Sequence, residues 1–204
     1  ATRRTGRGTS LNSQLMRGTS TYSVTKSILF FRRGKYGLSC DISKFYNRLL
    51  LHPENYNLHL SLWRPDMDPT SAPSVFVLVR HFYGVASTTA IMLACMEDAA
   101  TAATALGMPD VAETIRLAIV DDCLNSLDLE GDIGKLKSDL KQFMTSRGFP
   151  IKGFTLSGSK PDVTLSPNEH LLVGGWHWWP ETENMRLKTP LIFPGKTHKG
   201  RYKP

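Results

Sequence analysis

The spacing of apolar and polar residues predicts alternating helices and strands along the chain. Helical spacing of apolar residues indicates three helices, over 21–33, 86–106 and 134–147. Alternating or short continuous apolar runs indicate strands over 36–42, 58–63, 75–82, 115–120, 123–127, 151–156, 171–179 and 185–187. This order is typical of an α+β fold, with helices packed on one face of a mainly antiparallel sheet.

Two pairs of predicted strands are expected to form hairpins. The proline-rich segment 64–73 joins the strands 58–63 and 75–82. The dipeptide Asp121-Asp122 lies between the apolar runs 115–120 and 123–127, at the place of a two-residue hairpin turn. Both aspartates are therefore expected to project from one tight turn.

Composition narrows the classes of protein that fit this pattern. With 204 residues and 41% apolar content, the chain can bury one core. The formal charge of +7 favours a polyanionic partner such as nucleic acid, although many soluble proteins are equally basic. Three isolated cysteines indicate neither a disulfide scaffold nor a zinc site, and no apolar run is long enough to predict a membrane span. We expect a reducing, intracellular setting, and the first residue, which is not Met, suggests a piece of a longer protein.

Adjacent aspartates on an apolar turn repel each other unless a cation neutralises them. Mg²⁺ prefers oxygen ligands and takes one or two protein carboxylates together with substrate phosphates. Asp41, which ends the predicted strand 36–42, is the best third carboxylate for Asp121 and Asp122. Two such ions support nucleotidyl transfer by in-line displacement. Taken alone, however, the Asp121-Asp122 pair fits a solvated surface turn better.

Four segments resemble motifs of reverse transcriptases and occur in that family's order. Ala118-Ile-Val-Asp-Asp-Cys-Leu124 resembles the aromatic-x-Asp-Asp hairpin, and Cys40-Asp-Ile-Ser-Lys-Phe-Tyr46 resembles the first metal-binding strand. His81-Phe-Tyr-Gly-Val-Ala-Ser-Thr-Thr89 is similar to the Phe-Gly-Leu-x-Ser-x-Pro segment, and Leu172-Val-Gly-Gly-Trp176 resembles the primer-grip hairpin. Further matches, such as Ser10-Leu-Asn12 and the Gly-x-Trp-x-x-x-Pro-Glu-Thr-Glu pattern at 174–183, resemble the BEL/Pao group of LTR retrotransposons.

The resemblance implies an RNA-directed DNA polymerase that uses dNTPs on a primed RNA or DNA template. It implies two Mg²⁺ ions, with Mn²⁺ as a possible substitute, and no membrane partner. The implied organisation is a partial fingers region over 1–35, a palm over 36–190 with an inserted fingers hairpin at 50–82, and a linker over 191–204. The remaining polyprotein would supply the thumb, RNase H and integrase. The implied location is cytoplasmic, in a retrotransposon particle, with a possible nuclear phase.

Catalytic roles follow from the same resemblance. Asp41 and Asp121 would ligate both metal ions, and Asp122 would support one of them. The carbonyl of Ile42 would add a ligand. Lys152 would be the general acid for the pyrophosphate leaving group, or else an ordinary exposed lysine.

Substrate-binding roles also follow from it, each with a plainer alternative. Tyr46 would be the steric gate against ribose, or else an aromatic of the palm core. Tyr83 and Gly84 would lie under the incoming nucleotide. Arg3 or Arg4 would grip the triphosphate, or else belong to a basic tail. The resemblance assigns the primer terminus to Gly174, Gly175 and Trp176; Trp176, Trp178 and Trp179 would otherwise be core residues.

The chain departs from the family pattern at two places. Ile119 stands where an aromatic residue usually precedes x-Asp-Asp, and Thr88-Thr89 replaces Ser-Pro. These departures leave open a decayed or domesticated palm that binds nucleic acid or protein without catalysis. An RNA-dependent RNA polymerase is a further alternative, against which Tyr46 argues.

Overall fold

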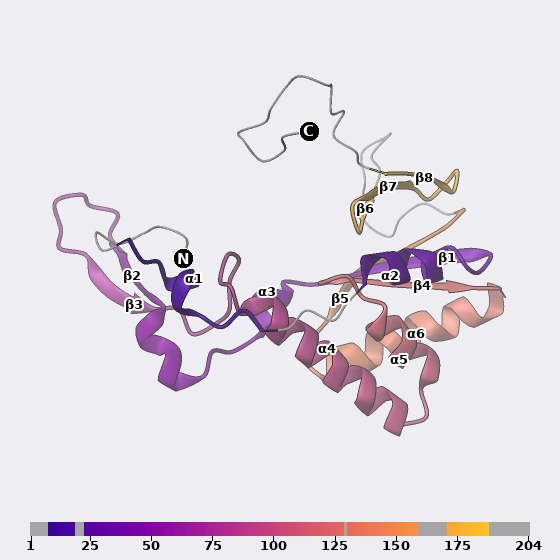
Figure 1. Ribbon diagram of the computed structural model, residues 1–204, viewed down its shortest axis with the longest axis horizontal. Helices are drawn as coiled ribbons and strands as arrows, with labels where there is room; N and C mark the ends of the chain where they lie inside the picture. The colour runs from indigo at the N-terminus through magenta and orange to yellow at the C-terminus, as the bar shows by residue number, and fades with distance from the viewer. Residues whose placement is uncertain (1–7, 19–22, 129, 159–170, 188–204) are drawn as a thin grey trace, which may run out of the picture.

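The computed structural model describes residues 8–18, 23–128, 130–158 and 171–187 and shows an α+β fold (Figure 1). Its strands form three small antiparallel sheets, in the orders β4-β1-β5, β2-β3 and β6-β7-β8. Within these ranges no helix is both long and apolar enough to cross a membrane. The predicted fold class is confirmed at this level.

The central sheet places β1 (Tyr36–Ile42) between β4 (Asp122–Leu127) and β5 (Ile151–Leu156). Against β4, Cys40 lies opposite Cys123 and Asp41 opposite Asp122. Against β5, the register shifts between Asp41 and Ile42, which marks a β-bulge. The strands predicted at 36–42 and 151–156 are confirmed with these bounds.

Three helices cover one face of this sheet: α4 (Thr88–Ala105), α5 (Pro109–Arg116) and α6 (Glu130–Ser146) (Figure 1). Ala99, Ala100 and Ala103 are fully buried, and such small side chains let α4 approach α5 closely. Leu140 and Met144 of α6 are also fully buried, and burying a side chain of this size contributes about 1.5–3 kcal/mol. The helical layer is therefore firmly attached to the sheet that carries the aspartates.

A fourth helix, α2 (Val24–Phe31), packs against the opposite face. It shares a small core with β4 and with the sheet of β6 (Leu171–Val173), β7 (Trp176–Trp179) and β8 (Asn184–Leu187). Phe31 meets Trp178 edge-on, with ring centroids 4.9 Å apart. The expectation that all helices share one face is thus wrong for α2. Successive residues of β4, such as Cys123 and Leu124, belong to different apolar cores, so both sheet faces need cover.

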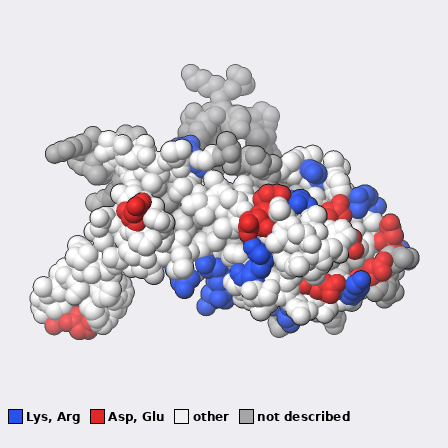
Figure 2. All heavy atoms as spheres, turned by 90° about the horizontal axis from the view of Figure 1, so that it is seen from below, with Lys and Arg blue, Asp and Glu red and all other residues white. Residues whose placement is uncertain are grey.

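The hairpin of β2 (Leu60–Trp63) and β3 (Ser74–Val77) extends away from this body, near α1 (Leu11–Gln14) (Figure 1). The short helices α3 (Phe45–Arg48) and η1 (Pro53–Leu58) lead into it from β1. The second strand is shorter than the predicted 75–82, because pairing stops at Val77 and resumes only as an isolated bridge between Leu50 and Arg80. Figure 2 shows the hairpin as largely uncharged surface, whereas charged side chains gather over the rest of the described body.

The prediction of a strand over 115–120 is wrong. Residues 109–116 form α5, with Pro109 in its first turn and Val111, Ala112 and Ile115 buried at helical spacing. The helix begins directly after α4, whose end is marked by Gly107 at φ 72°. The continuous apolar run Ile115–Val120 concealed this boundary, because short apolar runs do not distinguish a helix from a strand.

Candidate active site

Pairing between β1 and β4 brings the three predicted aspartates to one end of the central sheet. Asp41, near the end of β1, lies opposite Asp122, the first residue of β4. The amide of Ile42 donates to the carbonyl oxygen of Asp121 at 3.0 Å. The backbone of all three aspartates is therefore fixed by main-chain hydrogen bonds of the sheet and its turn.

The turn that carries Asp121 is tight and strained. Ile119 and Asp122 exchange two backbone hydrogen bonds, at 2.8 and 3.2 Å, which places Val120 and Asp121 at the turn centre. The turn thus lies one residue earlier than the sequence predicted. Val120 has φ 62°, a conformation that a β-branched residue rarely adopts and that costs about 1–3 kcal/mol. Backbone strain of this size is typical of functional turns.

The carboxylates are electrostatically unfavourable without a counter-charge. Burial, followed by the charges of Asp121 and Asp41, raises the pKa of Asp122 to about 7. Burial and the charge of Asp121 also raise the pKa of Asp41, and Lys152 partly opposes this rise. Grouped carboxylates that resist ionisation have the donor chemistry that Mg²⁺ prefers, so the residues present fit such an ion. Among the described residues, no three His, Cys, Asp or Glu side chains are already gathered around a metal-sized site.

The β-bulge sets the position of Lys152. Gly153 pairs with Asp41 and Ile151 with Ile42, which leaves Lys152 as the additional residue on β5. Its ammonium nitrogen lies 4.0 Å from Oδ2 of Asp41, and both side chains are well exposed. Lys152 is thus an exposed lysine that lies beside the aspartates.

Two tyrosines form an aromatic contact near the aspartates. The rings of Tyr46 on α3 and Tyr83 have centroids 3.9 Å apart and are tilted by 41°. Tyr46 is half-buried against the main core, whereas Tyr83 is 70% exposed. The pKa of Tyr83 is raised by burial and by the charges of Asp121 and Asp41. The two rings and the carboxylates therefore share one local environment.

Asn12 holds the turn that follows Tyr83, and the sequence analysis gave it no such role. Its side-chain nitrogen donates to the carbonyl of Gly84 at 2.6 Å, and its oxygen accepts from the amide of Ala86 at 2.9 Å. Gly84 has φ 89°, which a side chain would strain. The only signal in the sequence was the Ser10-Leu-Asn12 motif, whose partner is more than 70 residues away.

The tip of the β6–β7 hairpin reaches the aspartate turn from the opposite face. Gly174 and Gly175 both have positive φ, 55° and 88°, as a type I′ turn requires. A Cβ on Gly174 would lie 2.6 Å from Cδ1 of Ile119. Trp178 is fully buried, and Trp176 is half-buried against the same small core. The structure thus brings the predicted primer-binding glycines next to the turn of Asp121.

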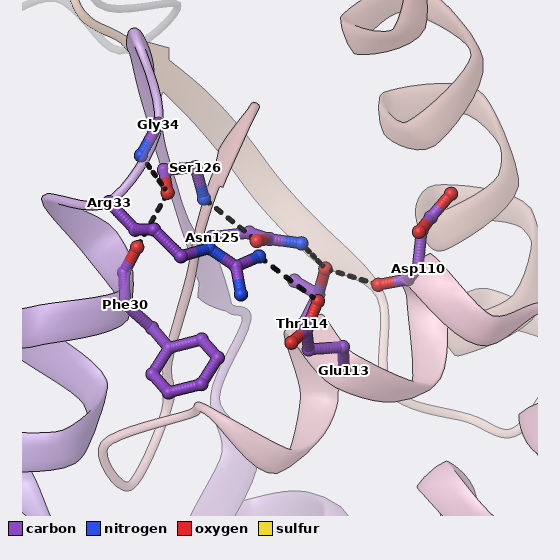
Figure 3. Close-up of polar contacts among 8 residues, drawn as sticks. All are labelled: Phe30, Arg33, Gly34, Asp110, Glu113, Thr114, Asn125 and Ser126. Carbon is purple, nitrogen blue, oxygen red and sulfur yellow. Dashed lines mark hydrogen bonds and ion pairs between the residues drawn. The ribbon is translucent and has the colours of Figure 1, made fainter. Parts of the chain in front are cut away.

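Buried polar contacts behind β4 connect this strand to α5 and α2 (Figure 3). The amide nitrogen of Asn125 donates to Oγ1 of Thr114 at 2.7 Å, and Thr114 donates to the carbonyl of Asp110 at 2.6 Å. Ser126 donates to the carbonyl of Phe30 and accepts from the amide of Gly34. No pattern in the sequence pointed to these residues. Their contacts fix the strand that begins at Asp122.

Arg3 and Arg4, predicted to grip a triphosphate, lie outside the described residues, as does the segment 191–204. Neither models of protein families nor curated proteins give a match to this sequence.

Proposed function

We propose that the chain is the palm and part of the fingers of a reverse transcriptase, which extends a primer with dNTPs by two-metal nucleotidyl transfer. The observation that carries the proposal is the β1–β4 register, which brings Asp41 to Asp121 and Asp122 and leaves the pKa of Asp122 at about 7. An array of carboxylates at this electrostatic cost is hard to explain as a solvated turn. Mg²⁺ or Mn²⁺ is the cofactor that this donor set suits.

In this mechanism Asp41, Asp121 and Asp122 would hold the ions, which supply charge neutralisation and activation for an in-line displacement. The chain itself contributes alignment. Tyr46 packs against the main core and contacts the tilted ring of Tyr83, and this aromatic surface beside the carboxylates would act as a gate against the ribose 2′-hydroxyl. Lys152, which lies 4.0 Å from Asp41, would give a proton to a departing phosphate group.

The test is primer extension by the protein with its upstream and downstream sequence restored. We expect Asp121→Asn to abolish extension while it leaves template binding largely intact, because it removes a ligand and adds no bulk. Glu181→Gln, an exposed carboxylate outside the site, is the matched control and should extend normally. Extension that persists in Asp121→Asn would refute the metal-site assignment.

Selection of the sugar gives a separate test. Tyr46→Ala should raise the incorporation of ribonucleotides relative to deoxyribonucleotides if the aromatic surface is the gate. Unchanged selectivity in a variant that still extends primers would remove Tyr46 from this role. It would also reopen the reading as an RNA-dependent RNA polymerase.

A second candidate function is a palm domain that binds nucleic acid or protein without catalysis. Ile119 favours it, since its side chain packs against Gly174 and offers no hydroxyl near the turn. Mg²⁺-dependent incorporation of a single nucleotide discriminates between the two, because the second candidate predicts binding without incorporation.

A further inference from the structure

A pocket of about 240 Å³ lies between the base of the β2–β3 hairpin and the start of α4, outside the candidate active site. Leucine and isoleucine side chains supply its apolar walls, among them Leu51, Leu58 and Ile91. Its polar lining comes from histidine, asparagine and serine side chains. One segment connects it to the aspartates, because His81 and Ser87 line the pocket and Tyr83 lies between them.

Two histidines of the lining are deeply buried, His59 and His81, each only 5% exposed. Nδ1 of His81 lies 3.3 Å from Oγ1 of Thr88. Nδ1 of His59 is buried and has no hydrogen-bond partner in the part of the chain that the structure describes. The ring of His59 is held edge-on by Phe82, with centroids 5.6 Å apart. A buried ring nitrogen without a partner is rare in folded proteins and is a place where a ligand can bind.

The charge of the lining limits the class of ligand. Burial lowers the pKa of both histidines, and each neutral ring offers one donor and one acceptor. The lining contains no Lys, Arg, Asp or Glu. Because no charged side chain of these types faces a ligand here, a phosphate is not matched. Among the described residues, no three His, Cys, Asp or Glu side chains are gathered to hold a metal ion, so this lining is not a metal site either. A neutral molecule with apolar faces and polar edges is matched.

The size of the pocket limits the ligand further. A volume of about 240 Å³ lies below the roughly 300–1,000 Å³ of pockets for drug-sized molecules. It therefore suits one heterocyclic ring system. We propose that this pocket binds a single unpaired nucleobase, whose edge hydrogen-bonds to His59 and whose faces contact the aliphatic walls. The source of the base, a nucleic-acid strand, rests on the proposed function.

The test follows the ring resonances of His59 and His81 by NMR in the full 204-residue chain, without divalent metal or dNTP. The probes are free adenosine, oligodeoxyadenylate and an abasic oligonucleotide of equal length. We expect adenosine or oligodeoxyadenylate to move both resonances, and the abasic oligonucleotide to leave them in place. Movement with the oligonucleotide alone indicates a base presented by a strand, and movement with both probes indicates a site that also accepts the free nucleoside. Movement with adenosine alone would overturn the strand as the source, and no movement with either would overturn the proposal.

Substitution gives a second readout. His59→Phe keeps a ring against Phe82 but removes the hydrogen-bonding edge, so we expect oligodeoxyadenylate to bind about 3- to 10-fold more weakly, while binding of the abasic strand is unchanged. The abasic strand is the control, and equal weakening of both strands would contradict a base-specific contact. If His59→Phe does not fold, the resonances of the unmodified chain still decide. Neither readout needs catalysis. Failed primer extension with shifted resonances would therefore refute the proposed polymerase function alone, and normal extension with unshifted resonances would refute the proposed nucleobase site alone.

Discussion

Replacing Asp122 by asparagine should stabilise the chain in the absence of divalent metal. The native state keeps a proton on Asp122 up to a pH of about 7, whereas the unfolded chain releases it near its ordinary value of 3.8. Folding is thus favoured by the protonated form, and this contribution is lost as the pH rises from about 4 through about 7. Asparagine removes the ionisation and preserves the shape of the side chain.

The size of the effect follows from the shift. A difference of about three pKa units at 1.36 kcal/mol each sets an upper limit of about 4 kcal/mol. Asp122 is only half-buried, so solvent screens part of its interaction with the charges of Asp121 and Asp41. We therefore expect roughly half of the upper limit, a stabilisation of about 2 kcal/mol at pH 8. For a chain of this length, that corresponds to a rise of about 4–8 °C in Tm.

The assay is urea unfolding with a chelator present, at about pH 4 and about pH 8, for the unmodified chain, Asp122→Asn and the control Glu181→Gln. The gap between Asp122→Asn and the unmodified chain should open as the pH rises, and added Mg²⁺ should narrow it at pH 8 by stabilising only the chain with all three carboxylates. A gap that does not depend on pH, or an asparagine variant less stable at pH 8, would refute the electrostatic reasoning.

Three other perturbations probe the surroundings of the site. Gly174→Ala should lower the free energy of unfolding by roughly 1–3 kcal/mol more than Gly175→Ala, because both have positive φ but only the former places a Cβ against a neighbouring side chain; urea unfolding of the pair measures the difference. Thr114→Val leaves the buried amide of Asn125 without its acceptor and should cost about 1–3 kcal/mol by the same assay, so an unchanged midpoint would contradict the contact. The two pocket histidines have lowered pKa values, so as the pH falls the unfolded chain binds protons at these residues before the folded chain does. His59→Phe should therefore gain stability relative to the unmodified chain as the pH falls from about 7 to about 5. An equal difference in unfolding free energy at the two pH values, measured in urea, would contradict this.

The elements with a clear period were predictable from the sequence. The strand Tyr36–Ile42 and the long helix α4 have unbroken apolar patterns, and both were predicted within two residues of their bounds. Helix α5 was not predicted, since its last turn merges with an apolar run and only Pro109 marks its start. The predicted position of α2 was wrong for another reason. Alternation along β4 indicates that both faces of the sheet are covered, but not which element covers each face.

The metal-binding residues of the candidate site could be predicted from the sequence, but the contacts that surround them could not. Asp41 and Asp121-Asp122 could be named from the sequence, because carboxylates at strand ends are visible in it. Asn12, whose side chain donates to the carbonyl of Gly84, is joined to this partner only by tertiary folding, so the residues around Asn12 do not predict the contact. The sequence also gives no sign of the β-bulge at Lys152, because the bulge depends on the register of β5 against β1.

The contact between Gly174 and Ile119 makes the aspartate turn and the tip of a distant hairpin a single steric unit. A missing Cβ on one side leaves the space that a branched side chain occupies on the other. An aromatic ring at position 119, as in the family that the turn resembles, would need more room than this glycine alone provides. Among relatives of this chain, residues 119 and 174 should therefore change together, and Ile119→Tyr by itself should push the β6–β7 hairpin away from α2 rather than recreate the usual motif.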